Sequence, residues 1–137
     1  MGEVRVSVNL TNAGDEILVR RGLLPTSEIR RYTANALVDT GAISSVLPIN
    51  VVQQLGLAIV GKVRTEYANN SSENVDVTEV VGIELLNRRT TEEMLVLGDE
   101  VLIGQTVLER LDLLVDCATQ RVIPNPEHPD QPVLKMK

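Results

Sequence analysis

The stretch Ala36-Leu37-Val38-Asp39-Thr40-Gly41-Ala42 decides the interpretation of this chain, because it places an ionisable side chain directly behind an apolar run. Apolar residues on both sides predict that the segment meets a core, where a charge is costly unless another group pairs with it or shares its proton. Gly41 has no Cβ, so a backbone amide can approach the Asp39 carboxylate, and Thr40 adds a hydroxyl that donates and accepts. Taken alone, Asp-Thr-Gly is also a common turn at a strand end, so that interpretation stays open here.

The pattern around this stretch predicts a mostly β chain. Apolar and polar residues alternate over 4–10, and a second predicted strand over 29–38 delivers Asp39. A proline at the start and a glycine at the end predict a short helix over 48–56. Residues 15–24 fit either a short helix or an irregular strand. The remaining prediction is a set of strands over 44–47, 101–103, 113–115 and 122–123, hairpins over 63–80 and 83–97, and a helix from about 105 to 111.

Composition supports a single domain with a β-rich core. The chain has 137 residues, of which 43% are hydrophobic, and it contains no Phe or Trp. Most of these apolar residues are Val, Leu, Ile and Ala, a selection that favours strands. We expect the domain to cover residues 1–123, and residues 124–137 to form a proline-rich tail without regular structure.

The charge of the chain argues against nucleic acid as a partner. The net charge is −6, and the arginine pairs 20–21, 30–31 and 88–89 are isolated, so we expect them to be solvated. Cys117 is the single cysteine and cannot form an internal disulfide, which suits a reducing compartment. No apolar run approaches the ~20 residues that span a bilayer, and the N-terminus lacks a signal peptide's apolar region. We therefore expect a cytoplasmic protein with no membrane partner.

A second apolar strand that ends in glycine, Leu102-Ile103-Gly104, follows later in the chain and leads into a predicted helix. The order of these parts, from the Asp39 loop through the 63–80 hairpin to Ile103-Gly104 and the helix, resembles the retropepsin-like aspartic proteases. The resemblance covers roughly residues 4–123 and is nearest to small prokaryotic members. It implies a single-domain, closed acid-protease β-barrel with one or two short helices and an active site at a homodimer interface.

The resemblance also implies roles for individual residues. Peptide hydrolysis by this route needs two carboxylates that share a proton, and the chain has only one Asp-Thr-Gly, so a symmetric homodimer would place Asp39 against its copy. Thr40 would hydrogen-bond across the interface, and Gly41 would supply backbone room and a donor. Ile103 and Gly104 would pack beneath the catalytic loop.

Three neighbouring positions differ from other members. Where acidic members often carry Ser, this chain has Ala42, which cannot stabilise the ionised pair, so we expect a working range near mild acid or neutral pH. Viral enzymes carry an acid and an arginine that pair with each other at the positions of Ile43 and Gln105. Neither member of that ion pair is present here, so no unpaired charge remains.

The 63–80 hairpin is the candidate flap. Its tip consists of Asn69, Asn70, Ser71 and Ser72, which have little to bury and suit a lid that opens over substrate. The same composition also fits an ordinary surface hairpin.

The other chemistry-bearing residues receive structural interpretations. We expect Cys117 to be a small buried or half-buried residue, His128 to be solvated, and Asp116 to lie in a turn. No residues have metal-ligand spacing, and no cofactor is expected.

The leading hypothesis is a homodimeric aspartic endopeptidase that acts on peptides or proteins. One alternative is a non-catalytic dimerisation or peptide-binding module on the same fold. Another is a monomeric β-barrel interaction domain in which Asp39 is only a turn residue.

Overall fold

Two long antiparallel strands form the centre of the fold, and the second of them ends directly before Asp39. The structure is a computed structural model that describes residues 2–136. Strands β1 (Val4–Asn12) and β2 (Arg31–Val38) pair along their length, with Leu10 opposite Tyr32. Because side chains alternate along a strand, one face of this pair carries apolar residues into the core and the other carries polar residues outward.

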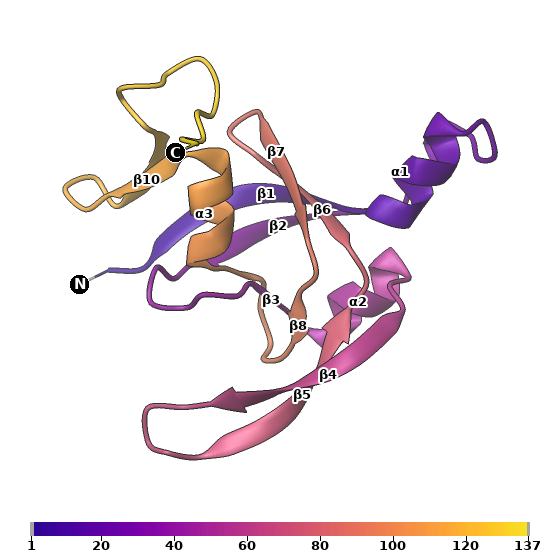
Figure 1. The fold of residues 1–137 in the computed structure, drawn as a ribbon, viewed down its shortest axis with the longest axis horizontal. Coiled ribbons are helices and arrows are strands. Elements are labelled where there is room, and N and C mark those ends of the chain that lie inside the picture. Colours follow the sequence, from indigo (N-terminus) through magenta and orange to yellow (C-terminus); the bar gives the residue numbers. More distant parts are fainter. Residues whose placement is uncertain (1, 137) are drawn as a thin grey trace.

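The remaining elements build a curled sheet around this pair (Figure 1). The larger sheet has nine strands in the order β4-β5-β8-β3-β9-β2-β1-β6-β7, and β10 and β11 form a separate two-stranded sheet. The other strands are β3 (Val46–Leu47), β4 (Ile59–Glu66), β5 (Ser72–Thr78), β6 (Val81–Leu85), β7 (Arg88–Glu92), β8 (Leu95–Val96), β9 (Leu102–Ile103), β10 (Leu113–Asp116) and β11 (Arg121–Pro124). The helices are α1 (Ala13–Arg20), α2 (Ile49–Leu55) and α3 (Gln105–Leu111), with a 3-10 turn over Thr26–Glu28.

This architecture confirms the predicted mostly β, retropepsin-like fold, with two differences of detail. The sheet is a half-barrel whose edge strands, β4 and β7, are not paired with each other, so it is open where a closed barrel was expected. Residues 2–136 form three short α-helices, where one or two were expected. The third is α1, in the segment that fitted either a helix or a strand.

Local hydrogen bonds decide that α1 is helical. The Asn12 side chain accepts from the backbone N–H of Asp15 and caps the first turn. At the other end Gly22 has φ +74°, and its N–H and that of Leu23 bond to the carbonyls of Val19 and Leu18. This is a Schellman ending, for which glycine is the favoured residue. The helix projects from the body of the molecule (Figure 1).

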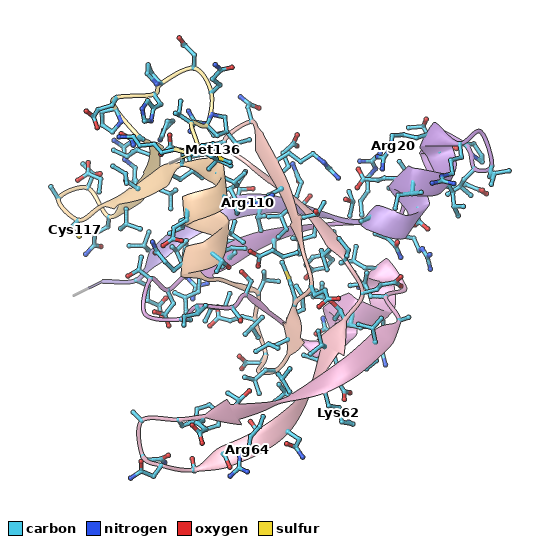
Figure 2. The ribbon with its side chains drawn as sticks, in the orientation of Figure 1. Arg20, Lys62, Arg64, Arg110, Cys117 and Met136 are labelled. Atoms are coloured by element: carbon cyan, nitrogen blue, oxygen red, sulfur yellow. The ribbon has the colours of Figure 1, made fainter. Side chains whose placement is uncertain are left out.

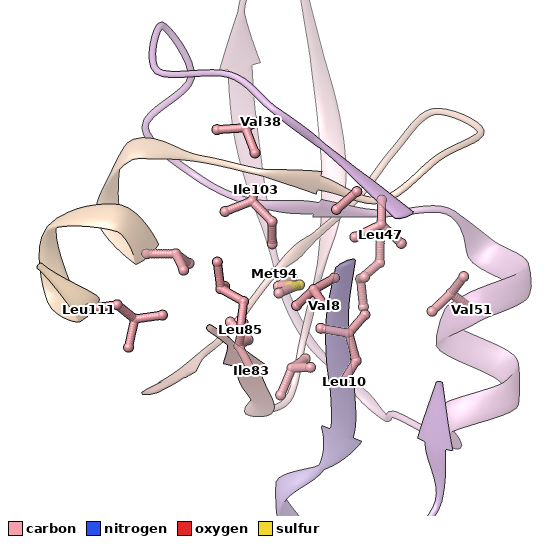
Figure 3. Close-up of a cluster of buried hydrophobic side chains, with 14 of the residues drawn as sticks. Val8, Leu10, Val38, Leu47, Val51, Ile83, Leu85, Met94, Ile103 and Leu111 are labelled. Atoms are coloured by element: carbon pink, nitrogen blue, oxygen red, sulfur yellow. The ribbon is translucent and has the colours of Figure 1, made fainter. Parts of the chain in front are cut away.

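The predicted helices around 48–56 and 105–111 are both present and cover the two sides of the half-barrel core. Gly56 ends α2 with φ +62°, in agreement with its predicted role. Apolar side chains from the sheet and from these helices form one cluster, part of which is shown in Figure 3. Its largest fully buried members include Leu10, Leu47, Leu55, Ile83, Met94, Ile103, Leu108 and Leu111.

The chain after β11 is tied to the end of α3. Asp112 is in a left-handed conformation, and its Oδ1 accepts from the Asn125 side chain at 3.0 Å. Its Oδ2 accepts from the Val133 N–H at 3.1 Å and lies 2.6 Å from His128 Nδ1. Asn125 is the largest contributor to a lowered pKa of Asp112. His128 is therefore half-buried and not solvated as predicted. The boundary at 123/124 remains a prediction.

Arg88 is a second correction. It was expected to be solvated, yet it is only 5% exposed. Its guanidinium donates to the backbone carbonyls of Leu111, Asp112 and His128. The carbonyls at the end of a helix lack partners within the helix, and this buried side chain supplies donors to them.

Candidate active site

Asp39 stands at the end of β2 with its backbone fixed and its side chain exposed. Strand β2 runs parallel to β9, with Leu37 opposite Leu102 and Val38 opposite Ile103. The Asp39 N–H donates to the Ile103 carbonyl at 3.0 Å, which continues this ladder by one residue. The carboxylate is thus placed by buried strands but remains open to solvent.

The loop after Asp39 turns back toward its carboxylate. The Gly41 N–H donates to Asp39 Oδ1 at 2.9 Å. The Ala42 N–H donates to the Asp39 carbonyl at 3.1 Å and closes the turn.

Gly104 packs directly beneath this loop. A Cβ at Gly104 would lie 2.7 Å from the Ser44 carbonyl oxygen and 2.8 Å from that of Ile43, so no larger residue fits without a backbone shift. The loop is also joined to α3, because the Gln105 N–H donates to the Ala42 carbonyl at 2.8 Å. The supporting role of Ile103 and Gly104 in an active site stays a prediction.

The sequence analysis missed two residues that support the loop. Ser45 is fully buried, and its Oγ accepts from the Gly104 N–H at 2.9 Å. Thr106 Oγ1 donates to the Ile43 carbonyl at 3.0 Å. A serine at the start of an apolar strand was the available signal, because a buried hydroxyl needs a hydrogen-bond partner.

The exposed side of the loop borders a hollow of about 320 Å³. Asp39 and Thr40 line it together with the N-terminal residues 2–4 and parts of β10 and the turn after it. Thr40 is exposed, and Ile43 is 73% exposed. The loop therefore presents an acid, a hydroxyl and a large apolar side chain at the surface of the molecule.

The candidate flap is a regular hairpin made by β4 and β5. The Tyr67 and Ser71 backbones close its tip, and the Asn69 side chain accepts from the Ser71 N–H at 3.0 Å. Asn70 has φ +69°, a conformation that Asn tolerates better than most residues. No hydrogen bond within residues 2–136 joins the tip, residues 69–72, to the Asp39 loop. Both extend toward the same side of the molecule in the view of Figure 1.

Two other candidate residues, Asp116 and Cys117, lie at and directly after the end of β10, and Cys117 borders the hollow beside Asp39. Asp116 is the last residue of β10 and not a turn residue as predicted. Its side chain accepts from the Ala118 N–H, and hydrogen bonding with Thr119 makes the largest contribution to lowering its pKa. Cys117 is exposed and not buried as expected. In the part of the chain that the structure describes, no three His, Cys, Asp or Glu side chains gather at a possible metal site. The helices there are too short or too polar to cross a membrane.

Comparison with solved structures shows the same class of fold. EIAV protease complexed with the inhibitor HBY-793 is 21% identical, with a TM-score of 0.51 over 79% of this chain and 86% of that chain. The retroviral protease-like domain of Ddi1 from Leishmania major is 15% identical, with a TM-score of 0.52 over 98% of this chain and 92% of that chain. The chain thus has the retropepsin-like fold.

The family follows from a sequence comparison. The model of the gag-polyprotein putative aspartyl protease family matches residues 26–110, more than half of the chain. The chain belongs to this family. A comparison with curated proteins gives no match.

Proposed function

We propose that this protein is an aspartic endopeptidase in which Asp39 and its copy in a homodimer activate one water molecule. The observation that carries the proposal is the geometry of Asp39. Its backbone is held by the Ile103 carbonyl, and its exposed carboxylate accepts from the Gly41 N–H. This arrangement is rigid where a catalytic group must be positioned and open where a substrate must arrive.

The chemistry needs both copies of the acid. One carboxylate takes a proton from water while the water oxygen attacks the peptide carbonyl, and the proton held by the other acid passes to the developing oxyanion. Two carboxylates whose oxygens lie about 3 Å apart share one proton, because both cannot be ionised at that separation. Ala42 offers no hydroxyl to the pair, so the rate should peak near mild acid or neutral pH. A peak below about pH 3 would contradict this expectation.

The surface around Asp39 supports a homodimer. The hollow beside it is lined by the apolar side chains of Val4, Leu37 and Val115, and it is continuous with the exposed Thr40. In a two-fold arrangement each of these residues would meet the same patch of the partner, and Thr40 would hydrogen-bond across the axis. The dimer would therefore complete the site and cover this apolar surface in one step.

The test is a peptide-library digest with and without pepstatin, on the wild type and on Asp39→Asn. The matched control is Asp116→Asn, which removes another strand-end carboxylate outside the loop. We expect cleavage by the wild type and the control, loss of cleavage with pepstatin and in Asp39→Asn, and a dimer for all three by sedimentation.

Each alternative has its own outcome. Cleavage retained by Asp39→Asn would reject the assignment of Asp39. A stable monomer would favour the interaction domain in which Asp39 is a turn residue. A dimer that binds peptides without cleaving them, whether or not Asp39 is changed, would favour the non-catalytic module.

A further inference from the structure

The two faces of the β4–β5 hairpin differ in chemistry. In its register Val63 lies opposite Val75 and Thr65 opposite Glu73, so these four side chains share one face. Val75 is only 5% exposed, which shows that this face turns toward the body of the protein. We call it the inner face, and by alternation it carries Val63, Thr65, Tyr67, Glu73, Val75 and Val77.

The outer face carries most of the charges of the hairpin. Lys62 and Asp76 form an ion pair at 2.5 Å, and Arg64 lies opposite Asn74. Lys62 and Arg64 are labelled on this hairpin in Figure 2. Glu66 alternates with Thr65 and belongs to the same outer set. These groups point away from the body and serve as a control for any effect of charge on the inner face.

Glu73 is the only residue of the inner face that carries a charge at neutral pH. It is exposed, and its Oε1 accepts from the Tyr67 hydroxyl across the hairpin. This hydrogen bond raises the pKa of the Tyr67 hydroxyl, so the phenol remains a donor at neutral pH. The carboxylate is thereby held near the tip of the hairpin, with its other oxygen free of side-chain hydrogen bonds within residues 2–136.

The inner face turns toward the side on which the catalytic loop lies. The loop after β2 and the hairpin extend in the same direction in Figure 1. The loop presents Ile43, 73% exposed, and no acid other than Asp39. An extended substrate between the two would therefore meet an apolar side chain on the loop and a single carboxylate on the hairpin.

We propose that Glu73 is a specificity-determining residue that selects peptides with a lysine or arginine side chain near the cleaved bond. This inference rests on the proposed function, because it treats the hairpin as the lid of the Asp39 site. A carboxylate under a lid that excludes water attracts a cation more strongly than one in bulk solvent. Tyr67 is the positioning residue, because its hydroxyl orients the carboxylate.

The experiment compares matched peptides that differ at one position, with lysine, its uncharged analogue norleucine, or glutamate in turn. The ratio of kcat/KM for the lysine and norleucine peptides is measured for the wild type, Glu73→Gln, Glu73→Lys and the outer-face control Asp76→Asn. We expect lysine to be preferred at one position by about tenfold, the effect of a partly desolvated charge pair. The preference should vanish in Glu73→Gln, reverse toward glutamate in Glu73→Lys, persist in Asp76→Asn, and weaken with added salt.

A binding measurement separates this inference from the proposed function. The affinities of the lysine and norleucine peptides for the Asp39→Asn protein are compared with and without the additional Glu73→Gln change. Cleavage with a lysine preference that is the same in wild type and Glu73→Gln would overturn the role of Glu73 and leave the protease assignment intact. Binding that prefers lysine through Glu73, without cleavage by the wild type, would support the role of Glu73 and reject the protease. A wild type with no lysine preference in either assay would overturn the inference.

Discussion

The substitution Gly104→Ala tests whether the Asp39 loop is supported from beneath. The added Cβ would lie 2.7 Å from the Ser44 carbonyl oxygen and 2.8 Å from both the Ser44 carbonyl carbon and the Ile43 carbonyl oxygen. All three are backbone atoms, so no side-chain rotation relieves the overlap. Gly104 is also buried, and its N–H is engaged by Ser45.

The magnitude follows from these distances. Ordinary van der Waals contact begins near 3.4 Å, so the loop or the start of α3 must move by about 0.7 Å, and overpacking of this kind costs about 1–3 kcal/mol. In a domain of this size that loss lowers Tm by about 4 °C for each kcal/mol. Because the moving backbone carries the catalytic loop, a shift approaching 1 Å should also reduce kcat/KM by up to about 100-fold.

The assay is urea unfolding of the wild type and the variant at equal protomer concentration, followed by kinetics on the same samples. The matched control for stability is Gly61→Ala, because a Cβ at Gly61 has no heavy atom within 4 Å and needs no unusual backbone angle. Replacing a strand glycine without a clash should leave stability unchanged or raise it by about 0.5 kcal/mol. A Gly104→Ala protein with the wild-type midpoint and wild-type kcat/KM would refute the proposed support.

Three further expectations follow from side chains that hold the fold together. Ser45→Ala leaves a buried N–H without its acceptor and should cost about 1–3 kcal/mol in urea unfolding, and an unchanged midpoint would contradict this. Arg88→Met removes a buried donor to three carbonyls and should lower the free energy of unfolding by about 3 kcal/mol. The control Arg89→Met removes a half-exposed ion pair with Glu16 and should cost less than about 1 kcal/mol. Equal losses of stability in the two variants would show that burial of Arg88 is unimportant. The pKa of Asp15 is lowered, chiefly by its hydrogen bond with Arg30, so its stabilising effect is complete above the unfolded pKa of about 4 and is lost as pH falls through the folded value. The difference in unfolding free energy between wild type and Asp15→Asn should therefore shrink below about pH 4, and a difference that stayed constant to strongly acidic pH would refute the role of this pair.

Local patterns explain why much of the fold was predictable. The ends of α2 could be predicted because Pro48 precedes its first turn and Gly56 follows its last. Gly56 has φ +62°, a backbone conformation that glycine adopts readily. The 63–80 hairpin was recognisable because its polar tip separates two alternating runs. Residues 15–24 stayed ambiguous, because α1 is short and exposes Ile17 and Leu18, so no apolar face pointed to a core.

Parts of the site escaped prediction because they depend on contacts that are distant in sequence. Ser45 supports the loop only because β9 brings Gly104 beside it, 59 positions later in the chain. Arg88 was expected in solvent because a charged residue is seldom buried without a charged partner. In the fold it meets backbone carbonyls at the end of α3, which no local pattern reveals.

The sequence by itself determined the chemistry that is available, namely one Asp-Thr-Gly and a second apolar strand that ends in glycine. Those features can be recognised without a structure, because a motif and an apolar strand are defined by the order of residue types along the chain. Only the tertiary structure decided that the Asp39 amide bonds to Ile103, that Gly104 has no room for a Cβ, and that Glu73 shares a face with buried Val75. Such facts depend on the register and packing of strands far apart in the chain, and packing is settled only when the whole core assembles.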